Sequence, residues 1–197
     1  MQKGTYGYIK AKRKVAAIRS FILITLCFAL FFFGLASSGS NRNVFSILAA
    51  VSCLPMGISV VNYAVFLKAR PCSKQVYEAV EKRRAGLLIF YDLMMTGDPH
   101  NFSMSAVTTL DKQIVCLTED EKMSIPEAQR HILKQIALSK YHHFQITVTK
   151  DLDEFLTALD ELNDIRIEKG IHPQAIEDAW VPGTVQTVAG VLKSISL

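Results

Sequence analysis

The sequence predicts an α+β protein that begins with a hairpin of two membrane-spanning helices. Two uncharged apolar runs, residues 20–36 and 44–67, are separated only by a short polar stretch. All eighteen acidic residues follow Arg70, whereas the chain up to Arg70 carries only basic charges. From Pro71 onward, helix and strand patterns alternate over a length that suits one domain with its own core. We therefore expect a basic tail (1–19), a transmembrane hairpin (20–67) and an α+β domain (71–197).

The charges that flank the two apolar runs predict their orientation. A spanning helix needs about 20 apolar residues, a length that the first run nearly reaches and the second exceeds. Basic residues precede the first run and follow the second, while the loop between them carries only Arg42. Because basic flanks stay in the cytoplasm, we expect a multi-pass membrane protein with both termini cytoplasmic. Cys27 and Cys53 fall inside the runs, where a thiol acts as a small hydrophobe.

The first apolar run has a second interpretation. Ala36-Ser37-Ser38 fits the small-residue cleavage site of a signal peptide, and the sequence leaves open whether the first run is cleaved. The second run would still end on the cytoplasmic side. The basic tail is expected to determine topology, and it could also contact anionic lipid headgroups at the bilayer surface.

The domain is expected to follow the order helix, three strands, helix, strand, helix. An apolar stretch between Gly86 and Met95 predicts a buried central strand, with a helix as the alternative. Two β-rich segments around Asp111-Lys112 predict an antiparallel hairpin, which completes a meander. The other expected elements are helices over 73–84, 125–141 and 152–168, a strand over 144–149, and a last helix containing Val185, Val188 and Leu192. Ser124 and Asp151, each followed by a glutamate three residues later, predict capping boxes.

This element order resembles the restriction-endonuclease-like fold. In that family an acid on the second strand and a Glu-x-Lys on the third hold magnesium and activate water. Asp111 and Gln113 fall near these positions, but the lysine is absent. The resemblance implies at most a divergent or inactive metal-dependent hydrolase tethered to the membrane.

Asp92 is the third candidate residue of that alternative. A carboxyl group inside a buried strand needs a partner. Asp98, His100 or a metal ion could supply one, but the favoured interpretation is that Asp92 lies at a strand edge or bonds a nearby backbone amide. Asp92, Asp111 and Gln113 are therefore the catalytic candidates of the nuclease-like alternative alone.

Other chemistry is poorly represented in the sequence. No glycine-rich phosphate loop, nucleophile elbow or zinc-type cysteine spacing occurs, so we expect no cofactor and no metal. Acidic and basic residues are segregated along the chain, so the positive net charge is an average over a basic amino-terminal part and an acidic domain. We therefore do not take it as a sign of nucleic-acid binding and expect no nucleic-acid partner. The sequence leaves enzymatic activity undecided but favours a protein without it.

The opening Lys3-Gly4-Thr5-Tyr6-Gly7-Tyr8, the basic stretch, the two apolar runs and the capped helix after His142-His143 resemble a family of small, uncharacterised two-pass membrane proteins of Gram-positive bacteria. The resemblance implies a bacterial plasma membrane setting and brings no site residues. We expect a membrane-anchored cytoplasmic domain that serves as an interaction or scaffold module, binding a partner protein or self-associating.

Overall fold

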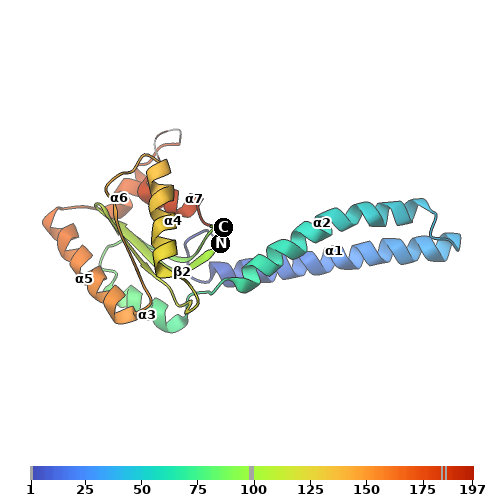
Figure 1. The fold of residues 1–197 in the computed structure, drawn as a ribbon, viewed down its shortest axis with the longest axis horizontal. Helices are drawn as coiled ribbons and strands as arrows, with labels where there is room; N and C mark the ends of the chain where they lie inside the picture. Colours follow the sequence, from blue (N-terminus) through green and yellow to red (C-terminus); the bar gives the residue numbers. More distant parts are fainter. Residues whose placement is uncertain (1, 98–99, 183, 185) are drawn as a thin grey trace. The chain divides into compact units, whose positions relative to one another are not determined.

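The computed structural model describes residues 2–97, 100–182, 184 and 186–197. The chain divides into two compact units: residues 10–68 form a helical hairpin, and residues 2–9 together with 69–197 form a folded α/β unit (Figure 1). The elements are α1 (Tyr8–Ser38), α2 (Val44–Lys68), α3 (Lys74–Arg83), β1 (Ile89–Met95), β2 (Phe102–Leu110), β3 (Gln113–Leu117), α4 (Ile125–Leu138), β4 (Gln145–Thr149), α5 (Leu152–Glu168), α6 (Pro173–Asp178) and α7 (Val188–Ser194).

The two helices of the hairpin are long and apolar enough to cross a membrane. They expose large apolar residues on their outer surfaces, for example Phe21 and Leu54, each 71% exposed. Helix α1 begins at Tyr8, so part of the predicted basic tail, residues 1–19, is helical. The lysines, arginines and alanines that precede Ser20 are strong helix formers, so the basic stretch continues the helix.

The turn of the hairpin is fixed by one asparagine. The Asn43 side-chain amide donates to the Gly34 carbonyl of α1 at 2.9 Å. Its Oδ1 accepts a hydrogen bond from the Ser46 backbone N–H at 2.8 Å, which is the bonding of an N-cap. One side chain therefore closes α1 and opens α2.

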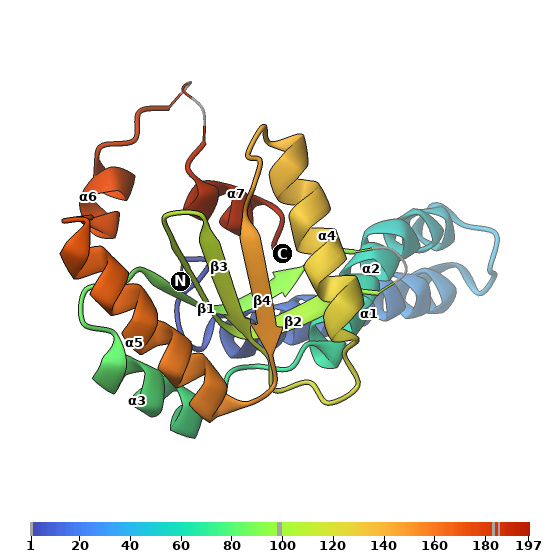
Figure 2. The same ribbon diagram turned by 60° about the vertical axis from the view of Figure 1, so that its left-hand side comes forward.

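The folded unit contains a four-stranded sheet in the order β1-β2-β3-β4. Strands β1, β2 and β3 form the predicted antiparallel meander, and β4 pairs in parallel with β3. Helices α4 and α7 cover one face of the sheet, while α3 and α5 cover the other (Figure 2). The predicted mixed α/β architecture is confirmed at this level.

Strand β1 is an edge strand of the sheet, although the sequence predicted a central strand. All seven of its residues are nevertheless buried. Two terminal segments cover its outer edge: the Tyr91 N–H donates to the Gly4 carbonyl at 2.9 Å, and the Leu197 N–H donates to the Met94 carbonyl at 2.8 Å. The prediction of a central strand is wrong, because an edge strand covered in this way shows the same continuous apolar pattern.

The segment 2–9 is part of the folded unit. Gly4 and Gly7 adopt φ values of 82° and 83°, which glycine reaches without steric cost. Between these two bends the ring of Tyr6 stacks on Tyr77, with the ring centroids 4.1 Å apart. The folded unit is therefore larger than the carboxyl-terminal domain that the sequence predicted.

Neither predicted capping box forms in full: at α5 the Asp151 N–H donates to the Thr149 hydroxyl, which in turn donates to Glu154, so only the N-cap is present. Asp151 caps α5 by accepting a hydrogen bond from the Asp153 N–H at 2.9 Å. Ser124 precedes α4, but its side chain makes no capping hydrogen bond. Val185, expected in the last helix, lies outside the described residues, and α7 begins at Val188 with Thr187 as its cap.

Candidate functional site

The three candidate residues of the nuclease-like alternative do not form one site. Asp92 is 1% exposed and lies within β1 with a left-handed φ of 53°. Its Oδ1 accepts a hydrogen bond from the Cys72 backbone N–H at 2.6 Å. In a regular strand, side chains three positions apart point to opposite faces of the sheet. The left-handed Asp92 interrupts this alternation, so that Phe90 and Leu93 pack into the same core. Asp92 therefore holds a backbone amide, as the favoured interpretation of the sequence expects.

Asp111 and Gln113 lie together at the β2–β3 turn. Asp111 adopts a φ of 53°, a conformation that aspartate tolerates better than most residues. Its carboxylate contacts the Lys169 ammonium at 2.7 Å. This hydrogen bond and the charge of Asp111 raise the pKa of Lys169. Gln113 pairs with Leu110 on β2 and Gln145 on β4 as an ordinary strand residue.

The register of the sheet separates Asp92 from the turn. Tyr91 and Leu93 pair with Ala106 and Met104, so Asp92 is level with Ser105. The β2 strand continues for five residues from there to Leu110, a distance of about 16 Å at the rise of a strand. Ligands of one magnesium ion lie about 2 Å from the metal. The geometry therefore gives no support to a shared metal ion at these residues.

No group of three or more histidine, cysteine, aspartate or glutamate residues suited to a metal ion occurs among the described residues. Asp98, one of the partners considered for Asp92, lies outside them.

Burial raises the pKa of the Cys116 thiol to about 12, so this thiol remains protonated at neutral pH.

A cavity of about 340 Å³ opens at the end of the sheet that carries the β2–β3 turn. Its volume falls within the range of small-ligand pockets. The wall is formed by the β2–β3 turn, the segment leading into α6, and the start of α7. The lining residues are Leu88, Thr109, Leu110, Asp111, Tyr141, Ile171, Pro173, Ile176, Glu177, Thr187, Val188 and Ala189.

Most of the cavity wall is apolar. The wall residues that carry a charge at neutral pH are two acids, Asp111 and Glu177. Asp111 already has Lys169 as a partner, whereas no ion pair among the described residues reaches Glu177. A carboxylate next to apolar surface favours a cation with an apolar body.

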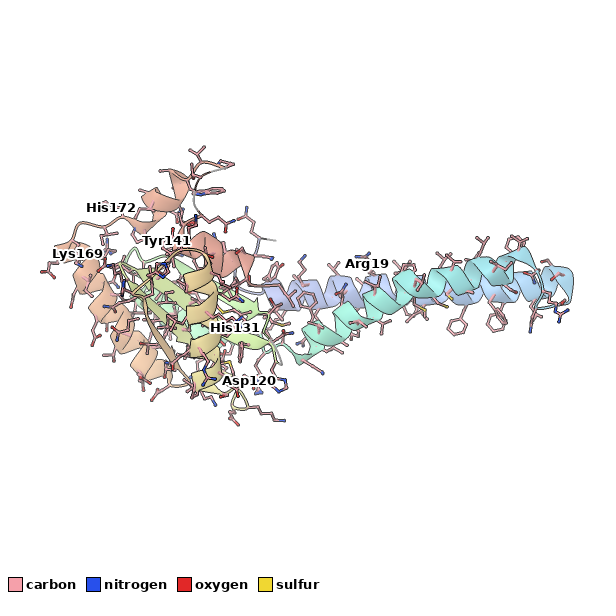
Figure 3. The ribbon with its side chains drawn as sticks, turned by 45° about the horizontal axis from the view of Figure 1, so that its top comes forward. Arg19, Asp120, His131, Tyr141, Lys169 and His172 are labelled. Carbon is pink, nitrogen blue, oxygen red and sulfur yellow. The ribbon has the colours of Figure 1, made fainter. Side chains whose placement is uncertain are left out.

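Two of the three hydroxyl groups of the wall, those of Tyr141 and Thr187, are bonded to the backbone. The Tyr141 hydroxyl donates to the Gln186 carbonyl at 2.6 Å, and the Thr187 hydroxyl accepts from the Gly190 N–H at 2.9 Å. These bonds fix the rim of the cavity and leave neither hydroxyl arranged as a nucleophile beside a base. Figure 3 shows Tyr141 and Lys169 toward one end of the folded unit, away from Asp120 and His131. The residues present favour binding by shape and charge.

The surface around α6 is apolar as well. Ile176 and Val181 are 54% and 60% exposed, and Trp180 is 38% exposed. Such a grouping of exposed apolar residues beside a pocket is typical of a binding surface.

Sequence reasoning found only part of this cavity. Asp111 was the one lining residue that the sequence marked as a candidate, and it was marked for a different chemistry. Glu177 and Tyr141 were missed, because they reach the cavity from segments that are 36 positions apart. One sequence signal for α6 was available: Pro173 lies in the first turn of this helix, a position that proline favours.

Comparison with protein-family models, with curated proteins and with solved structures gives no match to this chain.

Proposed function

We propose that this chain is a membrane-anchored interaction protein whose folded unit binds a partner protein at the α6 cavity. The cavity is the observation that carries the proposal. It combines an apolar wall with two carboxylates, and the apolar side chains of α6 continue beside it. The proposed activity is binding without catalysis.

The charges of the cavity suggest what the partner presents. A lysine or arginine can place its apolar stem along the wall and its charge near Glu177. Flanking apolar residues of the same segment can cover Ile176 and Val181. We infer that the ligand is a short protein segment with a basic residue beside apolar ones, and self-association is an alternative outcome of the test.

The setting of the folded unit is also a proposal. The basic flanks of the hairpin support a plasma membrane protein with both termini in the cytoplasm, as in the family of Gram-positive bacteria that the opening residues resemble. The meander followed by α4 and β4 supports a restriction-endonuclease-like topology. The missing lysine and the distance of Asp92 from the turn speak against the activity of that family.

The proposed orientation predicts the labelling of an introduced cysteine. We expect Ser40→Cys, in the loop of the hairpin, to react with a membrane-impermeant maleimide added to intact cells. A cysteine at Lys122, an exposed position of the folded unit, should react only after the membrane is opened. Labelling of the Lys122 position in intact cells would contradict a cytoplasmic folded unit.

The proposed binding predicts the outcome of a peptide selection. The full chain in lipid nanodiscs is used to select from a phage-displayed library of random peptides. We expect enrichment of peptides with lysine or arginine beside aliphatic or aromatic residues. Glu177→Lys should weaken their binding at least tenfold, because it places a cation where the peptide's cation binds.

Asp178→Lys is the matched control, since it makes the same charge change one residue away on a side chain outside the cavity wall. It should leave binding within about twofold. Equal loss in both variants, or enrichment of acidic peptides, would contradict the proposal. A doubled protein mass per nanodisc without peptide selection would indicate self-association instead.

A further inference from the structure

The two helices of the hairpin meet along a regular series of small residues. Ser20, Cys27 and Gly34 follow one another at intervals of seven, which is close to two helical turns, so they share one face of α1. The hydroxyl oxygens of Ser20 and Ser59 are 3.0 Å apart, and both residues are buried. Small residues at such positions allow two helices to approach closely.

The same series brings two thiols together. The sulfur atoms of Cys27 and Cys53 are 3.5 Å apart. Each thiol also lies 3.4 Å from the Ala49 carbonyl oxygen, to which it can donate while it is reduced. A disulfide has a sulfur–sulfur distance of about 2.05 Å, so the two atoms need to approach by about 1.5 Å to bond. This approach is small because the helix register already places the residues opposite each other.

We propose that Cys27 and Cys53 form an intramolecular disulfide that fastens α1 to α2 when a lipid-soluble quinone oxidises them. Both S–H bonds break and one S–S bond forms. The two hydrogen atoms, as two protons and two electrons, pass to the quinone, which becomes a hydroquinone. The thiol pair is thus a reversible modification site within the hairpin.

The surroundings of the pair determine the class of oxidant. Phe28 and Leu54, the neighbours of the two cysteines in the sequence, are 56% and 71% exposed on the outer surface of the hairpin. Such a surface suits hydrocarbon, where a charged thiolate or a charged oxidant is costly. Oxidised glutathione, which is charged and requires a thiolate, is therefore a poor oxidant for this site, whereas a quinone dissolves beside it.

The remaining cysteines do not compete for this reaction. Cys72 and Cys116 are 1% and 0% exposed within the folded unit. None of the four cysteines is in a disulfide bond in the structure.

The test counts thiols in the full chain reconstituted into phospholipid vesicles. The vesicles are treated with decylubiquinone or with oxidised glutathione. The protein is then denatured in the presence of N-ethylmaleimide, which alkylates the remaining thiols, and its intact mass is measured by mass spectrometry. Reduced protein should carry four maleimide groups, and the quinone-treated protein should carry two. Glutathione disulfide should leave four, and reduction after the quinone treatment should restore four.

Two variants make the result specific for the geometry. Cys27→Ser combined with Phe28→Cys keeps the number and depth of the thiols but moves one to an outward position, and it should retain four maleimide groups. Ser20→Cys with Ser59→Cys, on a background of Cys27→Ser and Cys53→Ser, is the positive control and should lose two. Retention of four groups by the native chain after quinone treatment overturns the proposal, whether or not the positive control reacts. Loss of two groups in the outward variant also overturns it.

Discussion

Asp92→Ala is expected to lower the free energy of unfolding of the folded unit by about 3 kcal/mol. The substitution leaves the buried Cys72 N–H without its acceptor, which costs about 1–3 kcal/mol, and places alanine at a left-handed φ, which costs about 1–2 kcal/mol. The measurement is pulse proteolysis of the full chain in detergent over a urea series. The fraction of intact folded unit gives the free energy at each concentration.

Two other substitutions at Asp92 separate the causes. Asp92→Asn keeps an acceptor oxygen and tolerates the left-handed conformation, so it should cost about 1 kcal/mol. Asp92→Gly relieves the backbone strain but removes the acceptor, and it should fall between the asparagine and alanine variants. If all three substitutions cost the same, neither the acceptor nor the backbone conformation explains the role of Asp92.

Tyr6→Ala is expected to lower the free energy of unfolding by about 2 kcal/mol. The ring of Tyr6 stacks on Tyr77 and meets Tyr91 edge to face at 6.5 Å, and aromatic pairs contribute about 0.5–1.5 kcal/mol each beyond the area that they bury. Hydrogen exchange of the Tyr91 amide should also become faster, because that amide donates to the Gly4 carbonyl of the same segment.

Tyr6→Phe is the control for this prediction, since it preserves both ring contacts and should retain most of the stability. Unchanged protection of the Tyr91 amide in Tyr6→Ala would show that residues 2–9 do not depend on the aromatic stack. Unchanged stability in Tyr6→Ala would show that the segment adds little to the folded unit.

Much of the secondary structure could be predicted from local patterns. The alternation of Phe144, Ile146 and Val148 marks β4, and the Asp111-Lys112 turn marks the β2–β3 hairpin. Asp151 marks the start of α5, and Gly170 marks its end with a φ of 60°. Each of these signals depends on neighbouring residues only, which is why they appear in a single sequence.

The remaining features depend on contacts between distant residues. The apolar pattern of β1 cannot distinguish a central strand from an edge strand that terminal segments cover. Gly4 and Gly7 lie where the chain bends, but no local pattern in the sequence shows that Tyr6 meets Tyr77. The cavity joins the β2–β3 turn to α6 and α7, so Glu177 had no signal of its own.

The cover of β1 has a consequence for the order in which this protein folds. Gly4 and Leu197 bond to the same strand, and the Lys3 ammonium donates to the Ser196 carbonyl at 2.7 Å. The amino-terminal segment emerges from the ribosome long before β1, and Ser196 and Leu197 emerge long after it. At about 5–20 residues per second, synthesis of the chain between Met95 and Leu197 takes about 5–20 seconds. During that interval the end of β1 at Met94 lacks its cover, so chaperone binding to the nascent chain is most useful between the synthesis of Met95 and that of Leu197.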